Sequence, residues 1–243
     1  MVPAAAVPAL AQRSDVRSIS PNRMTARTSS SLEYATGAMN VRTYNNGGTW
    51  TGLDGTGIGI AVLDSGVMWN HTNLGFSSGV SRVKAAVDLQ KAGDGAAAGV
   101  KDWTKGVDAS ASLYPGSPSM ANYEMLINNA QVNQTDMYGH GTHVASVAAG
   151  FGSYQAKDSS GIAPGANVYD VRVLSNRGYG QLSDVLAGID WVIYHAKEFN
   201  IRVMNLSLAA DSTETWQTDP LAVAVRSASA AGITVVVAAG ISA

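Results

Sequence analysis

Apolar residues occur in short continuous runs bounded by Gly, Pro, Asp or Asn. Runs of this length, rich in Val and Ile, are typical of strands that are buried on both faces of a sheet. They predict strands at residues 57–65, 83–89, 167–174, 201–208 and 233–240.

Between the later strands the apolar period changes to that of a helix. Residues 184–199 predict one helix, with Ser183 as a candidate N-cap. Asp219-Pro220 is a typical helix start and Gly232 a typical helix end, so a second helix is expected between them. Strands that alternate with helices predict an α/β fold, a doubly wound parallel sheet with helices on both faces.

Two stretches lack this alternation. Residues 12–50 are polar, and residues 91–134 are rich in Gly, Ala and Ser, which predicts an insertion at about 91–134. At the N-terminus, Ala9-Leu10-Ala11 fits the small-x-small pattern of a signal-peptide cleavage site. No basic stretch precedes it, so residues 1–11 are either a signal-peptide remnant or a flexible Ala/Pro leader.

Composition narrows the class of protein. The chain has 243 residues, of which 46% are hydrophobic and 14% charged, and this favours a compact domain. Its net charge of −2 gives no reason to expect a nucleic-acid partner. The absence of cysteine excludes disulfides and Cys-based metal sites. No apolar run reaches the roughly 20 residues of a transmembrane helix, so no membrane association is expected.

The stretch GHGTHVASVAAG, residues 139–150, carries the most specific chemistry. It places His140 and His143 three positions apart, whereas a zinc-protease helix needs His at i and i+4 with an intervening Glu. The remaining interpretations are a structural pair and a catalytic base. Glycines on both sides of His140 favour the base, because they let a substrate backbone approach. Asp64, at the end of a predicted strand, is a candidate carboxylate to orient it.

Six segments resemble successive motifs of the subtilisin-like serine proteases, in that family's order. They are AVLDSGV (61–67), GHGTHVAS (139–146), GIAPGA (161–166), VRVL (171–174), VMNLSL (203–208) and VVVAAG (235–240). The resemblance implies that Asp64 is the triad aspartate and His140 the general base. It implies a structural role for His143, buried behind His140.

The resemblance also implies a cleft for an extended peptide or protein substrate. One wall is the family's Ser-Leu-Gly strand, here Ser207, Leu208 and Ala209, with Ala in place of the last Gly. The other is a Gly-rich edge strand that resembles Gly178, Tyr179 and Gly180. A peptide between two such strands is held by main-chain hydrogen bonds.

The resemblance suggests a domain organisation. VRSISPNRMTART (16–28) resembles the last strand of the family's inhibitory propeptide, so residues 12–34 are expected to hold the propeptide end and a processing junction. Residues 35–243 are then a partial peptidase domain that ends before the last strands of the family's sheet. Secretion to the extracellular space is the expected localisation.

The family's nucleophile motif, Gly-Thr-Ser-Met-Ala, does not occur in the sequence. Ile241 occupies the position of the oxyanion-hole asparagine and donates no side-chain hydrogen bond. Ser119 lies in a similar segment, but it precedes His140 in the chain and follows a proline. The chain is therefore expected to be inactive alone. The alternatives are a non-catalytic peptide-binding module and a non-functional truncated product.

No cofactor and no catalytic metal are expected. Members of the family often carry structural calcium, and the stretch GFGSYQAKDSS is the place considered for it. Asp158 is its only acidic residue, so no strong calcium site is expected there.

Overall fold

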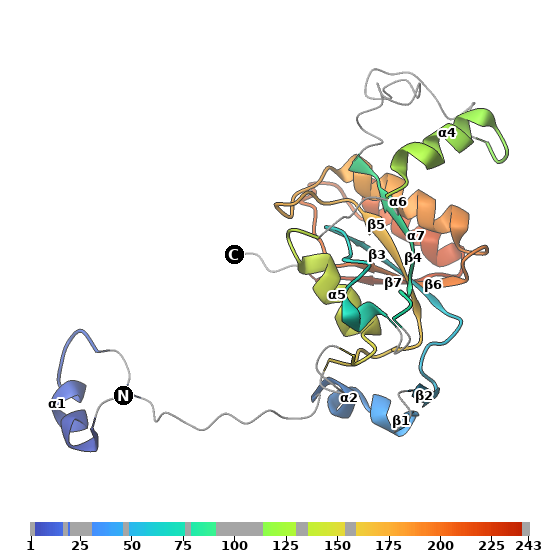
Figure 1. The fold of residues 1–243 in the computed structure, drawn as a ribbon. Helices are drawn as coiled ribbons and strands as arrows, with labels where there is room; N and C mark the ends of the chain where they lie inside the picture. Colours follow the sequence, from blue (N-terminus) through green and yellow to red (C-terminus); the bar gives the residue numbers. More distant parts are fainter. Residues whose placement is uncertain are drawn as a thin grey trace.

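A five-stranded parallel sheet forms the centre of the computed structural model (Figure 1), which describes residues 3–16, 19, 31–45, 49–75, 79–90, 114–129, 136–153 and 159–239. The strand order is β4-β5-β3-β6-β7. The bounds are β3 Gly59–Asp64, β4 Val83–Asp88, β5 Asn167–Arg172, β6 Ile201–Leu206 and β7 Thr234–Val237. Each lies within a predicted apolar run, and the predicted parallel sheet is confirmed.

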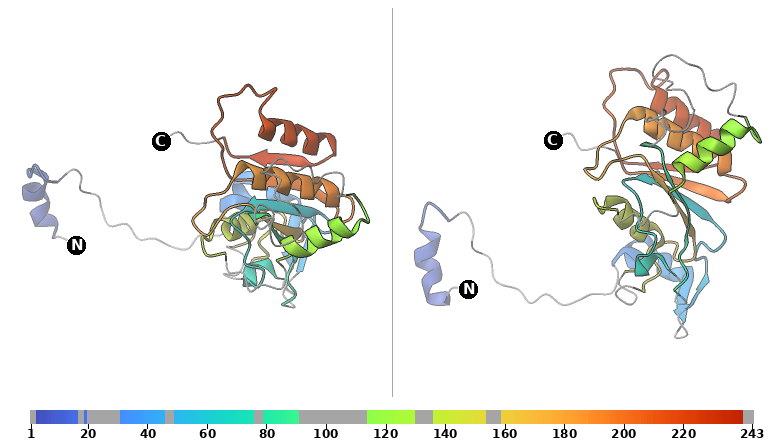
Figure 2. Two further views of the ribbon diagram at one scale, coloured as in Figure 1. Left: turned by 90° about the horizontal axis from the view of Figure 1, so that it is seen from above. Right: turned by 45° about the horizontal axis from the view of Figure 1, so that its top comes forward.

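Helices cover both faces of the sheet (Figure 2). Helix α5, His140–Ala149, packs on one face, and α6, Leu182–His195, and α7, Pro220–Ala230, pack on the other. The part of residues 91–134 that the structure describes contains a further helix, α4, Pro118–Ile127, beside α6. The expected insertion therefore contributes Ile127 to the core on the α6 side.

The side chains of β3 alternate between two hydrophobic cores. Ala61 and Leu63 belong to the core under α6 and α7, and Ile60 and Val62 to the core under α5. Because successive strand residues point to opposite faces, Asp64 continues the row that points toward α5.

The helix ends match the prediction in one case and differ in the other. Asp219 caps α7, with its side chain accepting a hydrogen bond from the backbone N–H of Ala222 at 2.8 Å. Helix α6 begins at Leu182 with Gln181 as N-cap, so the prediction of Ser183 as cap was wrong. Gln181 already has extended backbone geometry, and the helix therefore starts two residues earlier.

The remaining elements precede β3 or lie between β3 and β4. They are the 3₁₀ helices η1 (Ala4–Ala6), η2 (Ala38–Asn40) and η3 (Thr72–Leu74), the helices α1 (Val7–Ala11) and α2 (Ser31–Thr36), and the antiparallel pair β1 (Arg42–Asn45) and β2 (Thr49–Gly52). Most of the segment expected to end a propeptide lies outside the described residues, so the domain boundaries stay a prediction. No helix in the described part of the chain is long and apolar enough to cross a bilayer.

Candidate active site

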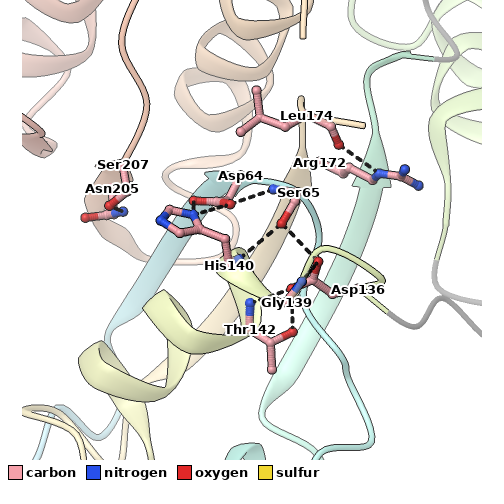
Figure 3. A network of polar contacts seen from close by, with 11 residues as sticks. Asp64, Ser65, Asp136, Gly139, His140, Thr142, Arg172, Leu174, Asn205 and Ser207 are labelled. Carbon is pink, nitrogen blue, oxygen red and sulfur yellow. Dashed lines mark hydrogen bonds and ion pairs between the residues drawn. The ribbon is translucent and has the colours of Figure 1, made fainter. Parts of the chain in front are cut away.

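Asp64 and His140 are in direct contact at the carboxyl end of β3 (Figure 3). His140 Nδ1 lies 2.8 Å from Asp64 Oδ1 and 2.9 Å from Oδ2. The Asp64 side chain is fully buried, whereas that of His140 is 41% exposed. A buried carboxylate thus holds one nitrogen of an imidazole that is open to solvent. The predicted contact is confirmed.

The close approach of α5 to β3 brings the two side chains together. A Cβ atom on Gly141 would lie 2.2 Å from the carbonyl oxygen of Gly66 and 3.0 Å from Asp64 Cβ. Only glycine fits there. Gly139 is the N-cap of α5, in the left-handed region at φ 83°. The glycines around His140 therefore serve helix packing and the helix start, and their role in the approach of a substrate stays a prediction.

Asp136 joins the loop after Asp64 to the first turn of α5 (Figure 3). Its Oδ1 accepts from Ser65 Oγ and from the Gly139 N–H, both at 2.9 Å. Its Oδ2 accepts from the N–H and the hydroxyl of Thr142 at 2.9 and 2.8 Å. The sequence analysis missed this residue as a site component. Its position just before the glycine N-cap of α5 was the available signal.

A second carboxyl group, that of Asp170 on β5, is buried on the same face of the sheet. It accepts a hydrogen bond from the Val67 backbone N–H, and its Oδ1 has no partner among the described residues. Burial, with a smaller contribution from the nearby Asp136 charge, raises its pKa to about 8. Asp170 is therefore a neutral acid below that pH.

His143 does not pack behind His140, and this prediction was wrong. It is exposed, whereas the buried positions of α5 are Gly141, Ala145 and Ala149. Two residues along a helix correspond to a rotation of about 200°, so His143 lies on the face opposite to Gly141. His140 alone of the two points to Asp64.

A cleft opens beside His140, and both predicted substrate-binding segments line it. The lining residues are Tyr138, His140, Leu174, Gly178, Tyr179, Gly180, Gln181, Leu182, Val185, Ser207, Leu208, Ala209, Ala210 and Leu221. Neither 178–180 nor 207–209 lies in a strand, which differs from the expectation. Strand β6 ends at Leu206, and residues 175–178 form a turn closed by a 2.9 Å bond from the Gly178 N–H to the Ser175 carbonyl.

Other candidates lie away from this cleft or outside the described residues. Ser119 is in the first turn of α4 and is not among the residues that line the cleft. Ile241 and Asp158 fall outside the described residues. Among the residues described, no three His, Asp or Glu side chains are arranged to hold a metal ion.

Comparisons with known proteins agree with this geometry. A sequence profile described as the Subtilase family matches residues 55–242. Subtilisin Savinase of Lederbergia lenta is 30% identical over 189 residues, 78% of this chain and 49% of Savinase. Extracellular serine proteinase of Thermus sp. (strain Rt41A) is 42% identical over 106 residues, 43% of this chain and 22% of that protein. The structure of sphericase matches with a TM-score of 0.53 at 26% identity, covering 84% of this chain and 52% of sphericase. The chain thus spans about half the length of Savinase and of sphericase, and a smaller share of the Thermus proteinase.

Proposed function

Since the chain belongs to the subtilase family, we propose that it carries the Asp–His part of a subtilisin-like serine endopeptidase site. The observation that supports this most directly is the 2.8 Å contact between the buried Asp64 carboxylate and His140 Nδ1, beside a cleft. The serine proteases among its relatives give the reaction class. The roles of individual residues are the proposal.

In this proposal Asp64 fixes the tautomer and orientation of the imidazole. A carboxylate that accepts from Nδ1–H leaves the lone pair on Nε2, which is the atom that removes a proton from a nucleophile. The carboxylate also stabilises the imidazolium that then forms. The exposure of His140 on the cleft side is consistent with this role of Nε2.

The substrate is proposed to be an extended peptide in the cleft, between residues 178–180 and 207–209. Both segments lie outside regular strands at the rim of the sheet, beside His140. Tyr179 is 78% exposed there, so its ring is available to a bound side chain.

A polypeptide of these 243 residues alone is proposed not to hydrolyse peptides at a protease-like rate. The proposal is supported by the sequence of these 243 residues, which does not include the family's Gly-Thr-Ser-Met-Ala nucleophile motif. In subtilisin itself, removal of that serine lowers kcat by about a millionfold. The test is a chromogenic peptide substrate, with His140→Ala as control. Turnover that disappears in this variant and is blocked by a serine-directed phosphonate would overturn the proposal of inactivity.

Peptide binding without catalysis is the second candidate function, because the cleft beside His140 is formed by residues outside the family's nucleophile motif. Binding of a fluorescent extended peptide, followed by anisotropy, tests it. Gly180→Val is the matched variant, since a Cβ there would lie 2.2 Å from the Val173 carbonyl oxygen and displace the cleft wall. Binding that this variant leaves unchanged would place the peptide elsewhere.

Secretion is also part of the proposal. It is supported by the description of the Thermus relative as extracellular and by the Ala9-Leu10-Ala11 pattern. Fractionation of an expressing culture into cells and medium tests it directly.

A further inference from the structure

His195 forms a second His–carboxylate cluster, at the C-terminal end of α6 and outside the candidate active site. Its Nδ1 lies 2.8 Å from Glu198 Oε2, and its Nε2 lies 3.2 Å from Glu124 Oε1. Glu198 is on the turn after α6, but Glu124 belongs to α4, 71 residues earlier in the chain. The imidazole therefore joins two elements that are far apart in sequence (Figure 1).

The surroundings of His195 keep the ring in place. The imidazole stacks on the ring of Phe199, with the ring centroids 5.1 Å apart and an interplanar angle of 11°. The ring centroid of Trp191, one helical turn earlier, lies 4.5 Å from that of His195. The Trp191 indole N–H also donates to Glu124 Oε2 at 3.4 Å. The side chain of His195 is only 11% exposed, that of Glu124 is 30% exposed and that of Glu198 is 62% exposed. Solvent therefore screens the His195–Glu124 contact far less than the His195–Glu198 contact.

Within the described part of the chain, helix α4 is also attached through apolar contacts and at its C-terminal end. Ile127 is its fully buried residue, and Tyr123 packs against the same core. Just after the helix, the Asn129 N–H donates to the Ala86 carbonyl at 2.8 Å. The contact of Glu124 with α6 adds a polar attachment in the middle of this ten-residue helix.

We propose that His195 is a proton-operated clasp, which fastens α4 to the core when the imidazole is protonated and releases it when the proton is lost. An imidazolium donates from both nitrogens and satisfies both glutamates at once. A neutral imidazole has a single N–H, so the lone pair of its other nitrogen faces a carboxylate. One of the two contacts then becomes repulsive.

The ionisable groups around the ring favour the protonated form. Burial disfavours the charge, but the hydrogen bonds and charges of Glu124 and Glu198 outweigh it, and the pKa of His195 is raised. The other ionisable side chains on the elements packed here are Tyr123 on α4, Asp190 and Tyr194 on α6, Lys197 on the turn, and Tyr169 on β5. Of these only Lys197 is a cation.

The sign of the pH effect follows from the raised pKa. The docking free energy is fully present below about 6.5, the pKa of an unperturbed histidine, and is lost as pH rises through the higher pKa of the docked state. Between these two pKa values, the equilibrium constant for docking falls by up to about tenfold per pH unit.

Hydrogen exchange of the full chain, followed by mass spectrometry, tests the clasp. The readout is the protection factor of a peptide covering α4, between about pH 6 and about pH 9, relative to a peptide from β3. We expect α4 protection to fall with rising pH by more than that of β3, whose protection follows the stability of the core. Equal protection of α4 across this range would overturn the proposal.

Two variants separate the clasp from ordinary packing. Glu124→Gln should remove most of the pH dependence, whereas Glu198→Gln, the matched change at an exposed position, should have a smaller effect. His195→Phe keeps an aromatic ring for stacking but cannot titrate, so its α4 protection relative to that of β3 should not vary with pH. A Glu124→Gln variant with the pH profile of the wild type and normal β3 protection would exclude the clasp.

Discussion

Asp136, which sequence patterns did not indicate as a site residue, positions two segments of the candidate site. One carboxylate accepts four hydrogen bonds, and these tie the loop after Asp64 to the first turn of α5. Asp136 contacts neither reacting atom and is a positioning residue. Asp170, below the same loop, is a buried acid whose charge the fold disfavours. Both acids can be tested singly.

Asp136→Ala is expected to lower the free energy of unfolding by about 2–4 kcal/mol, because it leaves the buried hydroxyl of Ser65 and the donors of Gly139 and Thr142 without their acceptor. It should also weaken the downfield NMR resonance of the His140 Nδ1 proton. Urea denaturation and proton NMR measure the two effects. Asp211→Ala, at an exposed position, is the control and should change stability by less than about 0.5 kcal/mol. An intact resonance in Asp136→Ala would exclude the positioning role.

Asp170 should make the protein less stable as pH rises. Its pKa is about 8 in the folded chain and lower in the unfolded chain, so the stabilisation is present at about pH 4 and is lost as pH rises through about 8. Asp170→Asn, which cannot ionise, should be less sensitive to pH and more stable than the wild type at about pH 9. Melting temperatures of both proteins across this range test the idea. Parallel pH profiles would count against it.

At the scale of elements, the candidate site depends on how closely α5 crosses the end of β3. The contact is made through Gly141, whose Cα faces the Gly66 carbonyl. The helix start at Gly139 then sets His140 as the first helical residue, directly above Asp64. The distance between α5 and β3 therefore determines whether Asp64 and His140 are in contact.

Gly141→Ala should destabilise the protein, although alanine is the better helix former by about 1 kcal/mol. The new Cβ would lie 2.2 Å from a backbone oxygen that cannot rotate away, so α5 must shift from β3. A loss of at least about 2 kcal/mol is expected by thermal or urea denaturation. Val147→Ala, on the exposed side of the same helix, is the control and should have a small effect. A neutral or stabilising Gly141→Ala would contradict this packing.

At the scale of the whole molecule, one buried cation joins segments from distant parts of the chain. Arg82 is fully buried and donates to the carbonyls of Ala166 at 2.7 Å, Asn73 at 3.2 Å and Ala149. These lie next to β5, in η3 and at the end of α5. Burial lowers its pKa to about 10, which still leaves it charged at neutral pH.

Arg82→Met should cost at least about 3 kcal/mol of folding stability, because the buried carbonyls of Ala166 and Ala149 lose the guanidinium donor and that of Asn73 keeps only the Phe151 N–H. The midpoint of urea unfolding measures the loss. Arg202→Met, at an exposed position of β6, is the matched control and should be near neutral. Similar midpoints for the two variants would show that Arg82 is not a structural cation.

The sequence by itself determined the sheet, the main helices and the Asp64–His140 pair. Five apolar runs predicted five parallel strands, and each prediction held. These features depend on the spacing of apolar residues along the chain and on short motifs, and both are local properties of the sequence. The order of parallel strands then brings their carboxyl ends to one edge.

Only the tertiary structure decided which residues support the pair and which do not. It showed that His143 is exposed, that Asp136 and Asp170 flank the Asp64 loop, and that α4 reaches His195. Each of these depends on contacts between segments far apart in the chain, and on the rotation of a helix about its axis. The residues next to a polar side chain in the sequence do not determine these contacts. Whether that side chain is buried depends on the distant segments that pack against it in the folded protein.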